Sequence, residues 1–181
     1  MTPDGTHVLF ASTGNRDLTM VALDGTRRVQ SLLQDPSVER NGIVSPDGRW
    51  LAYESDSSGQ FEIYVRPFPD VSAGQWLIST AGGTRPLWAP NGQELFHVAP
   101  GGALMASRVN PREGAWSADR PTKVVAGPYA TEGVRDRRTY DVSTDGQRFL
   151  MIKQSANEAT APRIVVVQHW LEELKQLVPP N

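Results

Sequence analysis

The chain has 181 residues and no cysteine, with 39% hydrophobic and 21% charged residues, which is typical of a globular domain. The lack of cysteine excludes disulfides, thiolate metal sites and a cysteine nucleophile. The net charge of −2 argues against nucleic acid as a partner, and no apolar run approaches the roughly 20 residues of a membrane span, so no membrane insertion is expected. Residues 1–5 lack the pattern of a signal peptide, so the compartment stays open, either extracytoplasmic or cytoplasmic.

A short turn motif recurs four times along the chain, each time before a run of strand-forming residues. The copies are Thr2-Pro3-Asp4-Gly5, Ser45-Pro46-Asp47-Gly48, Ala89-Pro90-Asn91-Gly92 and Ser143-Thr144-Asp145-Gly146. An Asp-Gly or Asn-Gly pair favours a tight hairpin turn, because glycine, Asn and Asp tolerate positive φ. The motif therefore predicts strands at residues 7–11, 50–55, 94–98 and 149–153.

The unit around the second motif is complete and sets the pattern for the others. It predicts strands at 41–45, 50–55, 61–66 and 75–80, and the third unit repeats them at 86–89, 94–98, 104–109 and 122–126. The last unit has candidate strands at 139–143, 149–153 and 163–168. Four antiparallel strands in about 40–45 residues are typical of one β-propeller blade.

The two ends of the repeat array differ from its middle. Only three residues precede Asp4-Gly5, so the first unit lacks most of its leading strand. Apolar residues at helical spacing from Trp170 to Val178 predict a short α-helix, which Pro179 ends. We therefore expect a single all-β domain, residues 1–181: a partial propeller of about four blades. Its repeat units are 1–36, 37–81, 82–128 and 129–169, followed by a helix at 170–178.

Several phrases of the sequence resemble a known family. Residues 45–55 and 62–68 closely resemble the TolB-type, WD40-like (PD40) propeller repeat. Residues 140–151 and 170–175 resemble the end of the bacterial propellers that follow serine/threonine protein kinase domains. The resemblance implies a TolB-like β-propeller with a sensory or extracytoplasmic role. No kinase motif is present in the sequence, so kinase activity is not implied.

The basic residues suggest a ligand site on one face of the propeller. Five arginines lie close to the predicted leading strands, whose connections meet near the central channel: Arg40, Arg85, Arg135, Arg137 and Arg138. A guanidinium group can bind a carboxylate or phosphate bidentately, so this face is expected to take a protein or a small anionic ligand. Alternatively, these arginines brace neighbouring blades through carbonyls and carboxylates such as Asp136.

An incomplete ring of blades leaves apolar faces uncovered at its ends. At the leading end these residues are Val8, Phe10, Met20 and Val21. Exposed apolar surface of this kind marks an interface, and two chains of about four blades give about eight, within the range of known propellers. We expect a homo-oligomer, with a dimer favoured. Alternatively, the predicted helix at 170–178 folds back and covers one of these faces within the same chain.

The leading functional prediction is therefore a non-enzymatic protein-interaction or ligand-sensing module. The alternative is a hydrolase or lyase at the channel mouth, with Glu132, Asp136, Asp141 and His97 as acid–base groups. The histidines have no metal-ligand spacing and no nucleophile-elbow motif is present, so we predict no metal, cofactor or catalytic serine. Glu54 and Asp56 are assigned to a solvated loop, and Trp116 to an exposed contact in a long loop. A third hypothesis is that the sequence is a truncated open reading frame that folds but has no independent role.

Overall fold

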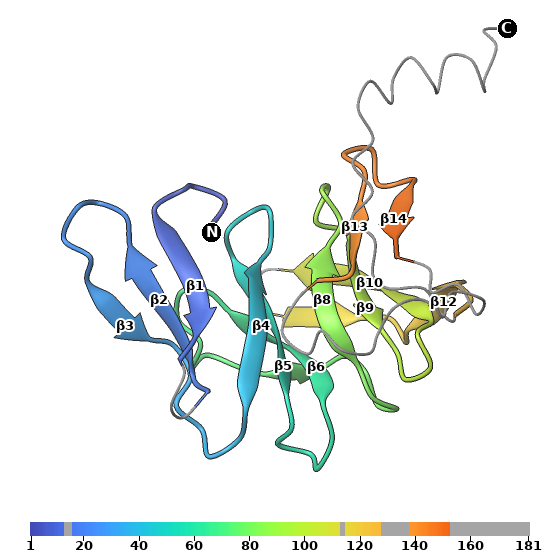
Figure 1. Cartoon of the computed structure of the whole chain (residues 1–181), viewed down its shortest axis with the longest axis horizontal. Coiled ribbons are helices and arrows are strands. Elements are labelled where there is room, and N and C mark those ends of the chain that lie inside the picture. The colour runs from blue at the N-terminus through green and yellow to red at the C-terminus, as the bar shows by residue number, and fades with distance from the viewer. Residues whose placement is uncertain (13–15, 113–114, 128–137, 153–181) are drawn as a thin grey trace, which may run out of the picture.

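In the computed structural model, residues 1–12, 16–112, 115–127 and 138–152 are described, and they form four antiparallel sheets side by side (Figure 1). The first sheet has the order β1 (His7–Ala11), β2 (Leu18–Ala22), β3 (Val29–Ser31). The second has β4 (Glu39–Val44), β5 (Trp50–Ser55), β6 (Glu62–Pro67) and β7 (Trp76–Leu77).

The third sheet is the largest of the four. It contains β8 (Thr84–Trp88), β9 (Glu94–Val98) and β10 (Leu104–Arg112), and both β11 (Ala115–Ala118) and β12 (Thr122–Val125) pair with β10. The last sheet pairs β13 (Tyr140–Val142) with β14 (Phe149–Met151). Strands β4, β8 and β13 each precede a turn motif and form one edge of their sheets; we call them the inner strands.

The four predicted turns are all present. Their glycines have positive φ, namely 72° at Gly5, 74° at Gly48, 70° at Gly92 and 73° at Gly146. Each glycine N–H donates to the carbonyl three residues earlier, at 2.8–2.9 Å. In three copies the side-chain oxygen of the Ser or Thr that opens the motif also accepts a hydrogen bond from the backbone N–H five residues later, as Ser45 Oγ does from Trp50 N at 3.0 Å.

The core lies between successive sheets, as the repeat predicts. One cluster joins the first and second sheets and includes Leu18, Met20 and Tyr53. Two further clusters join the second sheet to the third and the third to the fourth. Side chains alternate between these layers, because successive residues of a strand point to opposite faces. Tyr53 therefore faces the first sheet, whereas its neighbour Ala52 faces the third.

The all-β prediction is confirmed, with two local differences. The predicted strand at 75–80 is reduced to β7, and the expected long connection after residue 112 contains β11, which extends the hairpin from β10. Trp116 was expected to be exposed, and this is wrong: it is only 4% exposed, with its ring centroid 5.3 Å from Trp76 and 5.9 Å from Trp50. The predicted strand at 163–168 and helix at 170–178 lie outside the described residues. No helix within the described residues is long and apolar enough to cross a membrane.

Each end of the row of sheets presents an apolar face. In the first sheet the register places Val8 opposite Val21 and Val21 opposite Val29, on the face turned away from the second sheet. Val29 is 62% exposed and Phe10 is 40% exposed. Met20 was expected on this face, but it packs in the core on the opposite one, because it pairs with Leu9 in the alternating register. At the other end, Leu150 is 76% and Ile152 58% exposed.

Candidate functional site

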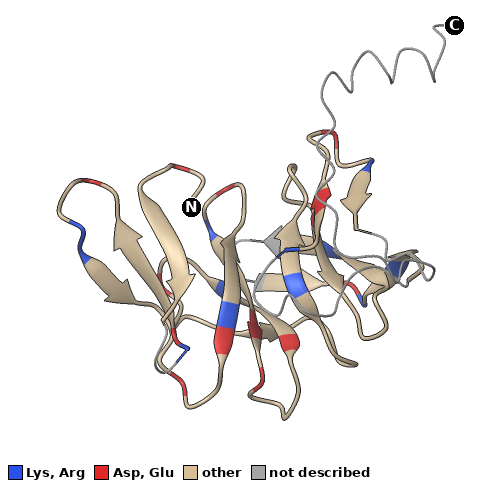
Figure 2. Ribbon diagram, viewed as in Figure 1, with Lys and Arg blue, Asp and Glu red and all other residues tan. Residues whose placement is uncertain are grey.

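Four arginines from separate parts of the chain line one cavity on the inner side of the sheets. The cavity has a volume of about 540 Å³, and its arginines are Arg16, Arg40, Arg85 and Arg138. We call it the arginine cavity; its other lining residues are Leu9, Phe10, Ala11, Ser12, Leu18, Asn41, Gly42 and Pro86. No described residue that lines it is acidic. Lys and Arg colour marks the inner strands β4 and β8 in Figure 2.

Unusual backbone geometry positions these side chains. Arg16, Asn41 and Arg85 have φ of 60°, 51° and 58°, a region that non-glycine residues rarely occupy. Asn41 and Arg85 lie at the same position of consecutive repeats, and each falls in a register shift of its inner strand, between Arg40 and Ile43 or between Thr84 and Leu87. Such a bulge turns side chains away from the regular alternation. Backbone strain of this kind costs about 1–3 kcal/mol per residue and clusters at functional sites.

Glu54 ties the inner strands of two sheets together beneath the cavity. It is fully buried, and its Oε2 accepts a hydrogen bond from Arg40 Nε at 2.7 Å. Its Oε1 accepts from Asn41 Nδ2 at 2.6 Å and from the backbone N–H of Arg85 at 2.5 Å. The carboxylate thus fixes the strained segment of β4 to that of β8. A solvated loop was predicted here, and that is wrong for Glu54.

Arg85 lies deeper than an ordinary surface arginine. It is 6% exposed, and burial lowers the pKa of its guanidinium group, an effect that the charge of Glu54 opposes. Its carbonyl oxygen accepts a hydrogen bond from the Tyr140 hydroxyl at 2.7 Å, which fixes the fourth sheet to β8. Burial also raises the pKa of Tyr140 well above its ordinary value, so this hydroxyl stays protonated.

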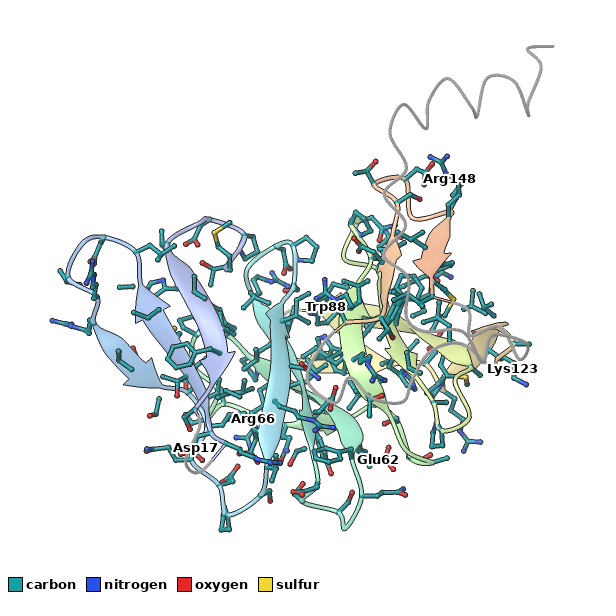
Figure 3. All side chains as sticks on the ribbon, viewed as in Figure 1. Asp17, Glu62, Arg66, Trp88, Lys123 and Arg148 are labelled. Atoms are coloured by element: carbon teal, nitrogen blue, oxygen red, sulfur yellow. The ribbon has the colours of Figure 1, made fainter. Side chains whose placement is uncertain are left out.

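Arg40 has its guanidinium carbon 3.9 Å from the centroid of the Phe61 ring. This cation–π contact and the Glu54 ion pair hold its long side chain in one orientation. Nearby, Trp88 at the end of β8 (Figure 3) donates its Nε1–H to the carbonyl of Ile43 in β4 at 3.2 Å. Contacts within the protein therefore hold the β4 and β8 walls of the arginine cavity in place.

The structure brings together part of the predicted ligand site. Arg40, Arg85 and Arg138 line one cavity, whereas Arg135 and Arg137 lie outside the described residues. Arg16 joins them in the lining of the cavity. Neither Glu54 nor the positive φ values could be recognised from the sequence, because a Glu in an alternating strand gives no sign of what it contacts.

Of the residues of the alternative, enzymatic prediction, the two that the structure describes, His97 and Asp141, lie in different settings. His97 is 1% exposed, and burial lowers its pKa to about 4, so it is a neutral residue of the core. Asp141 is exposed and pairs in register with Leu150, at the far face of the last sheet. Glu132 and Asp136 lie outside the described residues. The described His, Asp and Glu residues include no group of three that could hold a metal ion.

Comparison with known proteins supports the fold. No family model matches the sequence. The Protein TolB homolog of Chlorobaculum tepidum is 30% identical over 95 residues, which are 50% of this chain and 21% of that protein. The chain therefore spans about a fifth of the length of this curated relative.

Solved structures agree with this similarity. TolB from Acinetobacter baumannii has a TM-score of 0.61 at 15% identity, over 87% of this chain and 37% of that one. The fold is that of a TolB-like β-propeller. An oligogalacturonate lyase in complex with manganese has a TM-score of 0.51 at 15% identity, over 77% of this chain and 36% of that one. At these identities the TolB-like likeness establishes the fold alone, because propellers host many activities. The link to kinase-associated propellers stays a prediction.

Proposed function

We propose that this chain is a protein-interaction module whose arginine cavity binds a carboxylate group of its partner. The observation that carries the proposal is that four arginines, and no described acidic residue, line one cavity. Arginine binds carboxylates through paired, charge-assisted hydrogen bonds. The likeness to TolB-like propellers supports an interaction module.

The electrostatics of the site favour an anion. Among the described residues, four arginines and no acidic residue line the cavity, and Glu54 contacts its walls from below through Arg40 and the backbone of Arg85. Arg16 and Arg138 are the exposed members, and they are placed to approach a ligand from solvent. Arg40 and Arg85 are largely buried, and Arg40 is held in place by its ion pair with Glu54.

A titration with glutarate, a small dicarboxylate, tests this proposal. The readout is the NMR signal of each arginine side-chain N–H in the full chain. We expect the signals of the cavity arginines to shift, and those of the exposed Arg49 and Arg148 to stay in place. In the double variant Arg16→Asn, Arg138→Gln we expect the affinity to fall about tenfold or more. Asn suits position 16, because it tolerates positive φ. Equal affinity of the variant and the wild type would overturn the proposal.

We further propose that the module self-associates through its end faces. Consecutive sheets of the chain already pack face to face through apolar clusters. Among the described sheets, two faces of this stack have no sheet packed on them. One carries Val29 and Phe10, and the other carries Leu150 and Ile152. Two copies placed head to tail would cover both faces of each chain and close a ring.

A further inference from the structure

The inner edge of β1 has no strand beside it within the described residues. In the hairpin of β1 and β2, the Thr6 carbonyl accepts a hydrogen bond from Leu23 N–H at 2.8 Å. At the other end, Ser12 N–H donates to the backbone carbonyl of Asp17 at 2.9 Å. Hydrogen bonding alternates along an antiparallel pair, so Val8 and Phe10 also bond toward β2. The N–H and C=O groups of Leu9 and Ala11 therefore point to the opposite edge.

The other sheets have a strand at this position. β5 carries β4 on its inner edge, with Ala52 opposite Ile43, and β9 carries β8, with Phe96 opposite Leu87. Counting from the turn glycines, Leu9 of β1 corresponds to Ala52 of β5. The consecutive residues 9–12 line the arginine cavity, which shows that the unpaired edge of β1 forms one of its walls.

We propose that an extended, acidic segment of a partner protein binds here as an additional strand along β1. Its backbone pairs with the N–H and C=O groups of Leu9 and Ala11, and its carboxylates meet the arginines. The proposal rests on the function proposed above and adds the conformation and composition of the bound segment. Strand addition uses main-chain hydrogen bonds for affinity and alternate side chains for specificity.

Charge selects this occupant over the other candidates. A second copy of the chain at this edge would bring its own Arg16 and Arg138 toward the same arginines, and like charges repel. The strand predicted from the sequence at 163–168, which lies outside the described residues, begins with an arginine and contains no acidic residue. A partner segment that alternates apolar and acidic residues fits both the apolar lining, which includes Leu9 and Leu18, and the guanidinium groups.

Backbone amide hydrogen exchange on the full chain tests the inference. The probe is a short, capped peptide of alternating valine and glutamate, used beside its glutamine analogue and an analogue N-methylated at alternate residues. Without peptide, we expect the Leu9 and Ala11 amides to exchange rapidly and the Val8 and Phe10 amides to be protected by β2. The acidic peptide should slow exchange at Leu9 and Ala11 about tenfold or more, and each analogue should bind about tenfold more weakly.

Each other outcome has a defined meaning. Protection of the Leu9 and Ala11 amides in the chain alone overturns the inference. Protection that does not depend on protein concentration would mean that another part of the chain pairs with this edge. Protection that rises with protein concentration would mean that a second copy pairs with it. Binding of the acidic peptide without protection of Leu9 and Ala11, or equal binding of the N-methylated analogue, overturns strand addition but leaves the carboxylate site intact. Failure of both the peptide and glutarate to bind overturns the proposed function as well.

Discussion

Glu54 is the residue on which the geometry of the arginine cavity depends. Replacing it with alanine leaves Arg40, Asn41 and the Arg85 amide without their buried acceptor. Removing one partner of a buried charge pair typically costs about 3–5 kcal/mol. We expect Glu54→Ala to lower the free energy of unfolding by that amount in urea denaturation followed by circular dichroism.

The matched control for this loss is Arg49→Gln. Arg49 also pairs with a carboxylate, Asp47 at 3.2 Å, but both side chains are about half exposed. An exposed pair contributes about 0–1 kcal/mol, so the control should remain close to the wild type. Similar losses for the two variants would show that Glu54 does not organise the inner strands.

Glu39 gives the stability of the protein a defined dependence on pH. The residue is 1% exposed, its Oε1 accepts a hydrogen bond from Ser55 Oγ at 3.3 Å, and its buried Oε2 has no hydrogen-bond partner among the described residues. Burial raises the pKa of Glu39 to about 7, an effect that Asp35, Asp17 and Asp56 reinforce and the Ser55 hydrogen bond opposes. The folded state therefore keeps this proton at pH values where the unfolded chain has lost it.

The sign of the effect follows from this pKa. The contribution of Glu39 is fully present below its ordinary pKa of 4.5 and is lost as the pH rises to about 7. Glu39→Gln should therefore gain about 2 kcal/mol relative to the wild type between pH 5 and pH 8, after allowance for solvent screening. Urea denaturation of both proteins at the two pH values measures it. The opposite effect of His97, whose pKa is lowered to about 4, is common to both proteins and cancels. A difference that does not change with pH would contradict the assignment.

At the residue scale, the sequence predicted which residues lie on the channel side, but it did not predict which groups they contact. Arg40, Arg85 and Arg138 were expected on the channel side because their distance from the turn motif is nearly constant. Glu54 was missed because the strand pattern around it is equally compatible with a solvated side chain. The positive φ of Arg85 was not predicted, because arginine, unlike glycine or asparagine, gives no sign of this backbone conformation.

The edge of β1 makes a specific prediction at the scale of one element. Phe10→Pro removes an N–H that bonds to β2, whereas Ala11→Pro removes one that points to the open edge. Proline is tolerated on an edge strand where its missing N–H faces outward. We expect Phe10→Pro to be less stable than Ala11→Pro by at least about 1 kcal/mol in urea denaturation. The reverse order would mean that the edge of β1 faces the other way.

Most strands could be predicted because their turns carry a strong local signal. Gly48 and its equivalents fix each hairpin, and alternating apolar residues such as Leu51 and Tyr53 then define the strand that follows. Outer strands were predicted less well: β7 is much shorter than expected, since a strand at the periphery has one neighbour and little packing to define its ends. β11 was missed because it is formed by pairing with β10, and not by a pattern of its own.

At the scale of the whole molecule, the two end faces predict a dimer. Light scattering coupled to size exclusion should give twice the chain mass of 19.9 kDa. Val29→Glu on the first face, or Leu150→Glu on the last, should reduce the mass to that of one chain, because a charge buried between apolar faces is costly. Leu77→Glu changes a residue that is 49% exposed in β7, away from both faces, and should remain dimeric. A wild-type mass of 19.9 kDa would contradict self-association.

The overall architecture could be predicted from the period of the repeat, because stacking equivalent sheets is the means by which each unit buries its two apolar faces. The arginine cavity could not be placed in the same way. It combines residues 16, 40, 85 and 138, and their approach depends on how four sheets and the strained inner strands fit together.

The central claim is that the arginine cavity binds a carboxylate-bearing segment of a partner protein. The most direct test is the affinity of the full chain for the acidic valine–glutamate peptide, measured by calorimetry beside the double variant Arg16→Asn, Arg138→Gln. The matched control, Arg49→Gln with Arg148→Gln, removes the same charge elsewhere on the surface. We predict about tenfold or greater loss in the cavity variant and little change in the control. An equal loss in both would mean that the peptide responds to overall charge, and would contradict a specific site.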